Sequence, residues 1–184
     1  MKQAILLLGA LLVCPHAALA QKNNLDLKSQ AAIVFNPHDA RIIYDKNADK
    51  VMPIASITKL MTAMVTLDAR LSAHERITIT HPDADMLKRT SSRLPIGSTY
   101  PRHELLRLAL MSSENRAAAA LGRTYPGGIT AFIKAMNQKA KKIGMSNSRF
   151  VDSTGLNSDN VATARDLAKL VTASNKYTVI REFS

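Results

Sequence analysis

Ser56 and Lys59 form a Ser-x-x-Lys pair that could carry out nucleophilic chemistry. Residues three apart lie on one face of a helix, so the hydroxyl and the amine can approach each other. Serine becomes a good nucleophile when a neighbouring base takes its proton, and lysine can be that base when burial lowers its pKa. A chain of this length contains on the order of one such pair by chance. A helix N-cap serine followed by a surface lysine is therefore the competing interpretation.

Ser113 and Asn115 form a second candidate site, between a Leu-rich segment and an Ala-rich segment. A break between two buried helices can direct a hydroxyl and an amide into a cleft. There the hydroxyl can relay a proton to a leaving amine, and the amide can bind a substrate carbonyl. The run Ser158-Asp159-Asn160 is a rival, but it directly precedes a helix expected from about Ala162. Ser, Asp and Asn are favoured there as caps and turn formers, so we set the rival aside.

The elements that must position these residues are a short hairpin followed mainly by helices. Two strands alone do not make a stable sheet, so either helices cover them or further strands are missing. No closing element is expected after the last helix. The expected strands are 31–35, 41–44, 77–80 and 150–151, and the expected helices begin near Pro53 and Ser56, at Arg102 (to Met111), around 117–120, around Phe132 (ending at Gly144), and at Thr163 (to Ser174).

The N-terminus has the pattern of a secretory signal peptide. Lys2 precedes the apolar run 4–13, and Ala18-Leu19-Ala20 gives a small-x-small cleavage site before Gln21. We therefore expect a signal peptide at 1–20, a flexible lead at 21–28 and a periplasmic protein; a buried N-terminal helix is the alternative. The single cysteine, Cys14, lies within the signal, so the mature chain would contain no thiol, and Val13 before it argues against lipid anchoring.

The charge and the composition narrow the choice of partners. The 184 residues favour one domain, or one and a fraction, rather than two, and the net charge of +11 favours anionic surroundings. Export makes nucleic acid a poor partner, and the aromatic content of 4% with no Trp agrees. Peripheral association with an anionic membrane stays open. His38, His74, His81 and His103 lie at no metal-ligand spacing, so we expect no metal and no cofactor.

Three stretches in order, 53–64, 108–118 and 152–156 (Asp-Ser-Thr-Gly-Leu), closely resemble the low-molecular-mass penicillin-binding proteins. The resemblance is to the D-alanyl-D-alanine endopeptidase (penicillin-binding protein 7) type and runs from about Ser29 to the last residue. It implies that Ser56 attacks a D-alanyl carbonyl of a peptidoglycan peptide stem and forms an acyl-enzyme. Lys59 would be the base, Ser113 the proton relay and Asn115 a substrate-binding residue. In the endopeptidase type, the bond cut is the D-alanyl–diaminopimelyl cross-link, and β-lactams would bind covalently.

One departure limits this reading, because the family's third motif, Lys-Thr-Gly, occurs nowhere in the chain. In the family, this motif lies on a strand that forms one wall of the site. The implied fold is an incomplete α+β, serine β-lactamase/DD-peptidase-like transpeptidase fold. Residues 29–184 would be its N-terminal portion, a β-hairpin plus a helical region, with the C-terminal sheet strands missing.

Two alternatives remain open. The first is an inactive truncated fragment of that enzyme. The second is a class A β-lactamase, which needs a glutamate for deacylation. This alternative is disfavoured because no glutamate lies near Thr154-Gly155-Leu156; the chain contains only Glu75, Glu104, Glu114 and Glu182.

Overall fold

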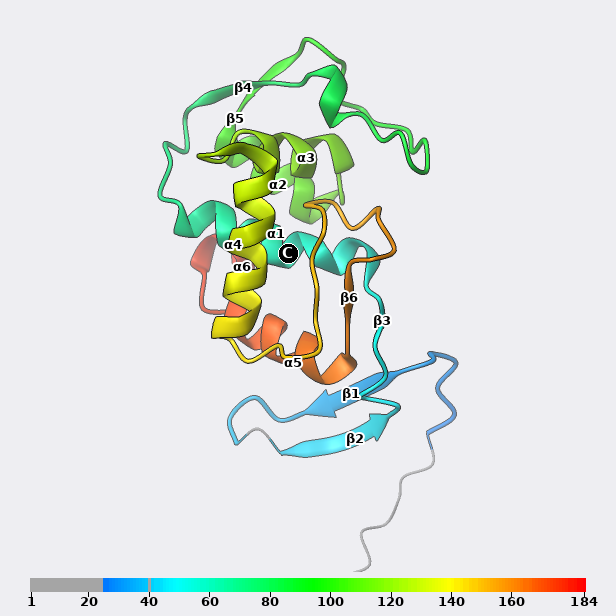
Figure 1. Cartoon of the computed structure of the whole chain (residues 1–184). Coiled ribbons are helices and arrows are strands. Elements are labelled where there is room, and N and C mark those ends of the chain that lie inside the picture. Colours follow the sequence, from blue (N-terminus) through cyan, green and yellow to red (C-terminus); the bar gives the residue numbers. More distant parts are fainter. Residues whose placement is uncertain (1–24, 40) are drawn as a thin grey trace, which may run out of the picture.

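The computed structural model describes residues 25–39 and 41–184. The expected signal peptide and its cleavage site lie outside these residues, as does part of the expected flexible lead. Within the described ranges the architecture is α+β: a body of helices, with a separate β-hairpin on one side (Figure 1).

Helix α1 (Thr58–Asp68) runs through the centre of the body. Met61 and Met64 are completely buried, and so is Thr62, because other helices pack around α1. A helix that is largely apolar on every side belongs in a core, as the sequence pattern predicted. Its start differs from the prediction. Pro53 belongs to strand β3 (Met52–Pro53), and the 3₁₀ turn η1 (Ala55–Ile57) carries Ser56 into α1.

The other helices surround α1. The helix expected between Arg102 and Met111 is confirmed with those bounds. A further short helix follows Ser174, which the sequence did not predict; its Ile180 is buried in the core and anchors it. The helices are α2 (Arg102–Met111), α3 (Asn115–Arg123), α4 (Gly128–Lys142), α5 (Ala164–Ser174) and α6 (Thr178–Phe183).

The strands of the described residues form three antiparallel pairs. Strand β1 (Ala32–Phe35) pairs with β2 (Ile42–Lys46), close to the predicted hairpin. Strand β3 pairs with β6 (Val161–Ala162), and the two run side by side in Figure 1. Strand β4 (Arg76–Thr78) pairs with β5 (Thr99–Pro101). A 3₁₀ turn, η2 (His81–Asp83), follows β4.

The strand expected at Phe150 and Val151 is wrong. Two side-chain amides take the place of a strand partner there. Asn137 Oδ1 accepts the N–H of Phe150 at 3.0 Å and Asn137 Nδ2 donates to its carbonyl at 2.7 Å, while Asn160 Oδ1 accepts the N–H of Val151 at 2.6 Å. Backbone groups satisfied by side chains in this way need no neighbouring strand.

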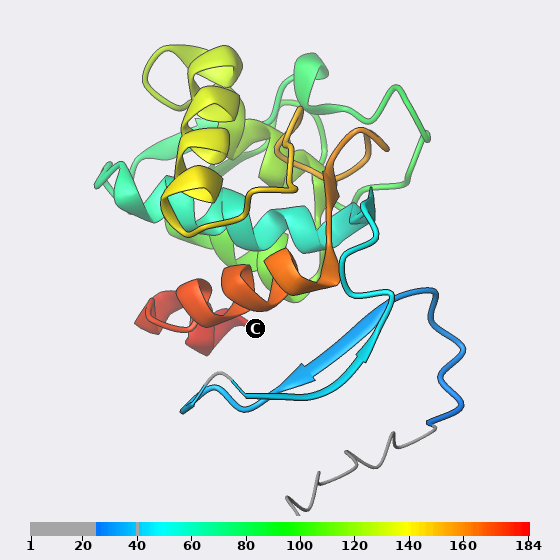
Figure 2. The same ribbon diagram turned by 60° about the horizontal axis from the view of Figure 1, so that its bottom comes forward.

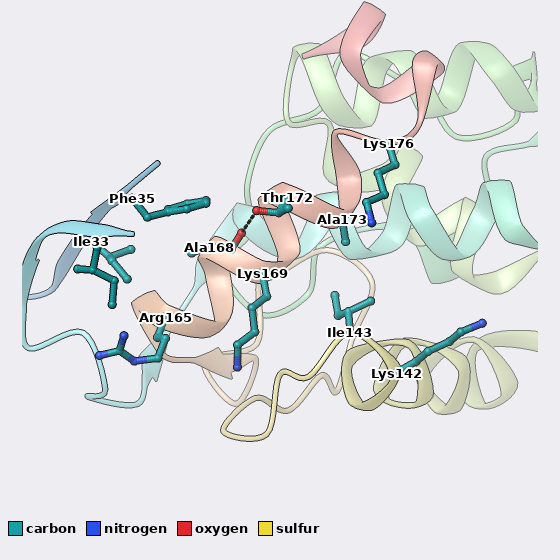
Figure 3. Close-up of a pocket in the computed structure, with 11 residues that line it drawn as sticks. Ile33, Phe35, Lys142, Ile143, Arg165, Ala168, Lys169, Thr172, Ala173 and Lys176 are labelled. Atoms are coloured by element: carbon teal, nitrogen blue, oxygen red, sulfur yellow. Dashed lines mark hydrogen bonds between the residues drawn. The ribbon is translucent and has the colours of Figure 1, made fainter. Parts of the chain in front are cut away.

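The hairpin packs only loosely on the helical body. Helix α5 lies between the hairpin and the body in Figures 1 and 2. A groove of about 520 Å³ separates them, and Figure 3 shows Ile33 and Phe35 of β1 facing it across from α5. On the hairpin, Val34 and Ile43 remain exposed as well. Apolar side chains on both faces are typical of strands that are covered on both sides.

Candidate active site

Ser56 and Lys59 lie at the start of the central helix α1. Strand β3, paired with β6, comes just before η1, and η1 leads directly into α1. Ser56 is exposed, whereas Lys59 is only 3% exposed. Lys59 Nζ lies 3.2 Å from Ser56 Oγ and donates to it. The competing interpretation of a surface lysine is therefore wrong. Ser56 does not cap α1 either, since the N-cap position is Ile57 and no side chain caps it.

Lys59 has two further partners, and both can only accept a hydrogen bond. Its Nζ donates to Asn115 Oδ1 at 2.8 Å and to the carbonyl oxygen of Thr154 at 2.8 Å. In the neutral amine, these two acceptors use both N–H groups. The lone pair is then left for Ser56, which is the arrangement that a base needs in order to take the hydroxyl proton.

Burial lowers the pKa of Lys59 to about 8, against the charges of Asp152 and Glu114, which act to raise it. A substantial fraction of Lys59 is therefore neutral near pH 8. This lowered pKa changes the free energy of unfolding with pH in the direction opposite to that of a lysine whose pKa is raised by an ion pair. Between pH 8 and the ordinary lysine pKa the unfolded chain binds more protons, so the free energy of unfolding rises with pH in that window.

Ser113 reaches the same point from the break between α2 and α3. Its Oγ donates to Ser56 Oγ at 2.8 Å. Ser113 has a φ of 53°, a left-handed conformation that is uncommon outside glycine. Strained backbone conformations of this kind cluster at functional sites, and they persist only where the surrounding packing holds them in place. The structure thus brings all four predicted residues, Ser56, Lys59, Ser113 and Asn115, into one cluster.

Sequence reasoning assigned no role to Thr154, whose carbonyl is the third partner of Lys59. The Asp152 carboxylate shapes this loop by accepting the N–H groups of Thr154 and Gly155, each at 2.6 Å, and that of Asn157 at 2.8 Å. The signal was present in Asp-Ser-Thr-Gly-Leu, since aspartate followed by Ser, Thr and Gly is typical of a side-chain-supported turn.

The rival run does not reach Ser56, so setting it aside as a catalytic site stands. Ser158 and Asp159 lie in a turn, as expected. Asn160 differs from the expected cap: it is completely buried and its Nδ2 donates to Thr58 Oγ1 at 3.2 Å. The N-cap of α5 is Thr163. Asn160 therefore ties the 151–160 segment to the start of α1.

Gly155 makes a close approach that should not tolerate a side chain. A Cβ there would lie 1.9 Å from the carbonyl oxygen of Ala55, the residue before Ser56, and Gly155 has a φ of +85°. We expect Gly155→Ala to lower the free energy of unfolding by about 3 kcal/mol, because overpacking and left-handed strain add. Urea unfolding of the purified chain measures this change.

Gly97→Ala is the matched control, since Gly97 has a φ of +89° and a Cβ added there would meet no atom within 4 Å. It should cost only the backbone strain, about 1 kcal/mol. Equal losses in the two variants would show that the contact with Ala55 does not matter.

Comparison with known proteins decides the family. The sequence profile described as D-alanyl-D-alanine carboxypeptidase matches residues 17–184. The chain belongs to this family. The match begins earlier than the start near Ser29 expected from the resemblance. Among curated relatives, the D-alanyl-D-alanine endopeptidase of Escherichia coli K12 is 48% identical over 172 residues, covering 94% of this chain and 56% of the relative.

The corresponding endopeptidase of Pseudomonas aeruginosa is 48% identical over 159 residues, covering 86% of this chain and 51% of the relative. The chain thus spans about half the length of these relatives. Penicillin-Binding Protein D2 from Listeria monocytogenes, solved in a cefotaxime-bound form, superposes with a TM-score of 0.78 at 36% identity, covering 87% of this chain and 67% of that one. The predicted DD-peptidase-like fold is confirmed.

A Streptomyces K15 DD-transpeptidase variant superposes equally well, with a TM-score of 0.78 at 28% identity, covering 84% of this chain and 64% of that one. Within residues 25–39 and 41–184, no group of His, Cys, Asp and Glu side chains is arranged to hold a metal ion. In the same ranges, no helix is both long and apolar enough to cross a bilayer.

Proposed function

We propose that this chain carries the acylation machinery of a serine D-alanyl-D-alanine peptidase, with Ser56 as the nucleophile. The observation that supports it most directly is the convergence of Lys59 and Ser113 on Ser56 Oγ, at 3.2 Å and 2.8 Å. The proposed substrate class is the peptidoglycan peptide stem. The 48% identity to two endopeptidases favours the D-alanyl–diaminopimelyl cross-link as the bond cut.

The proposed reaction begins with neutral Lys59, which takes the proton of Ser56 as Oγ attacks the D-alanyl carbonyl. A tetrahedral oxyanion forms near the start of α1, where the partial positive charge of the helix favours developing negative charge. The proton then passes from Lys59 through the Ser113 hydroxyl to the leaving amine. The carbon–nitrogen bond breaks, which leaves a Ser56 ester and a free amine. Attack by water releases the carboxylate and restores Ser56.

Asn115 has two roles in this proposal. Its Oδ1 uses one N–H of Lys59, which keeps the lone pair directed at Ser56. Its position beside the nucleophile also allows the amide to bind a backbone carbonyl of the substrate. The Lys-Thr-Gly tripeptide does not occur in these 184 residues. The resemblance to the family implies that the strand carrying this motif lends a backbone N–H to the oxyanion hole, and loss of one such donor costs about 100- to 1,000-fold in rate. We therefore propose slowed acylation at the present site and full turnover in a protein that includes such a strand.

We further propose that the chain is exported and acts in the periplasm, where peptidoglycan is found. This proposal is based on the pattern of residues 2–20 and on the basic net charge, which suits an anionic envelope. β-Lactams are the proposed covalent inhibitors. The D2 protein has been solved in cefotaxime-bound and ampicillin-bound forms, which supports the same binding here.

Labelling of the purified mature chain with fluorescent penicillin tests the proposal. We expect one long-lived adduct, which peptide mass mapping places on Ser56. A folded chain that never labels, or an adduct on another residue, would contradict the proposal. Release of many hydrolysed nitrocefin molecules per chain would instead favour the β-lactamase alternative.

A further inference from the structure

The loop between η2 and β5 contacts Asn115 of the candidate active site through a hydrogen bond to which the proposed reaction assigns no role. Thr90 Oγ1 accepts a hydrogen bond from Asn115 Nδ2 at 3.0 Å. Asn115 is also the residue whose Oδ1 accepts from Lys59. Thr90 is therefore two hydrogen bonds away from the amine of Lys59.

Asp85 determines the direction in which the Thr90 hydroxyl donates its proton. Thr90 Oγ1 donates to Asp85 Oδ2 at 2.7 Å, and an ionised carboxylate can only accept. The hydroxyl proton is therefore committed to Asp85, and Thr90 presents only lone pairs to Asn115. A lone pair can hold the NH₂ group of an amide but repels its oxygen. The Asn115 oxygen is consequently turned toward Lys59.

The loop is constructed to keep Asp85 in this state. The carboxylate also accepts the N–H groups of Leu87, Lys88 and Thr90, each at 2.9 Å. Burial acts to raise the pKa of Asp85, and the hydrogen bonds outweigh it and lower the pKa to about 2. The charge is thus present at any pH at which Lys59 can act.

Strain and anchoring both support a positioning role. Arg89, directly before Thr90, has a φ of 50°, which a non-glycine residue adopts only at a cost. The loop is fastened to α3 at both ends: Arg123 pairs with buried Asp83 at 2.8 Å, and Arg116 donates to the carbonyl of Leu94 at 2.6 Å. Helix α3 begins with Asn115, so the loop and the amide that it holds share one support.

We propose that Asp85 and Thr90 are positioning residues of the candidate active site. Together they hold the Asn115 amide with its oxygen directed at Lys59. Their effect on acylation rests on the proposed function, whereas their effect on the titration of Lys59 does not.

Thr90→Val is the test, because valine keeps the β-branched shape and removes the hydroxyl at an exposed position. We expect the penicillin acylation rate to fall about tenfold, the worth of one net hydrogen bond. Thr90→Ser should restore the rate to within about twofold of the original chain. The control Thr172→Val removes another exposed threonine hydroxyl, on α5, and should leave the rate unchanged. Equal losses in the Val and Ser variants, or no loss in either, would overturn the proposal.

A titration of Lys59 by ¹³C and ¹⁵N NMR separates this proposal from the proposed function, since it needs no acylation. When Asn115 is no longer held, the charged amine loses an acceptor. The pKa of Lys59 should then fall by about 0.5 in Thr90→Val, with Asp152 and Glu114, the carboxylates whose charges act on it, unaltered. An unchanged Lys59 pKa would overturn the proposal even in a chain that labels.

A double-mutant cycle tests the order of the two residues. If Asp85 acts through Thr90, then Asp85→Asn should slow acylation, and adding it to Thr90→Val should cause little further loss. Fully additive losses would show that Asp85 acts by another route, and this part of the proposal would be wrong.

Discussion

Ser56→Ala should abolish covalent labelling by fluorescent penicillin. Removal of the nucleophile of a serine peptidase costs on the order of a million-fold in rate, so the adduct should fall below detection. Ser113 Oγ lies only 2.8 Å from Ser56 Oγ, but within the described residues no hydrogen bond joins it to Lys59, so it has no comparable base. The variant should fold normally, since Ser56 is exposed and caps no helix.

Ser112→Ala is the matched control for Ser56→Ala. Ser112 is an exposed serine beside Ser113, and in the described residues its side chain has no hydrogen bond to Ser56 or Lys59. It should label at the original rate. Labelling that persists in Ser56→Ala would show that another residue is the nucleophile, and mass mapping would then identify it.

Lys59→Arg should lower the acylation rate by about 100- to 10,000-fold, the usual contribution of a general base. Arginine keeps a positive charge and ample donors for Asn115 Oδ1 and the Thr154 carbonyl, but it does not lose its proton in the working pH range. Stopped-flow measurement of acylation in both chains gives the ratio. If Lys59→Arg acylates at the rate of the original chain, Lys59 is not the base.

The pH dependence of the acylation rate is a second test of the role of Lys59 as the base. With a Lys59 pKa of about 8, the neutral fraction rises about 50-fold between pH 6 and pH 8. The acylation rate of the original chain should follow this rise and level off above it. In Lys59→Arg the rise should disappear. A rate that falls with increasing pH would mean that the charged lysine is the active form.

The relation between sequence and structure differs among the elements. Helix α2 was predicted with its bounds, because its leucine spacing and flanking residues act locally. Strand β6 and its partner β3 were not predicted, since two residues each give no periodic pattern. The final helix α6 was missed because a helix of this length is not stable by itself. Burial of Ile180 in the core stabilises it, and that contact cannot be seen in a local sequence pattern.

The expected domain division, with its signal peptide and lead, stays a prediction. The family and the fold class were predicted from the residues of the three motif stretches, 53–64, 108–118 and 152–156, and from their order in the chain.

The sequence identified the residues of the candidate active site: spacing suggested Ser56 and Lys59, a place between two helices suggested Ser113 and Asn115, and the resemblance of the surrounding stretches to the family assigned their roles. Only the tertiary structure decided their chemistry. Burial lowers the Lys59 pKa, and the segments that contact its amine are distant in the chain. Thr154 and Thr90 lie 95 and 25 residues from the groups that they contact. Contacts of that kind depend on packing between segments, and no local pattern encodes them.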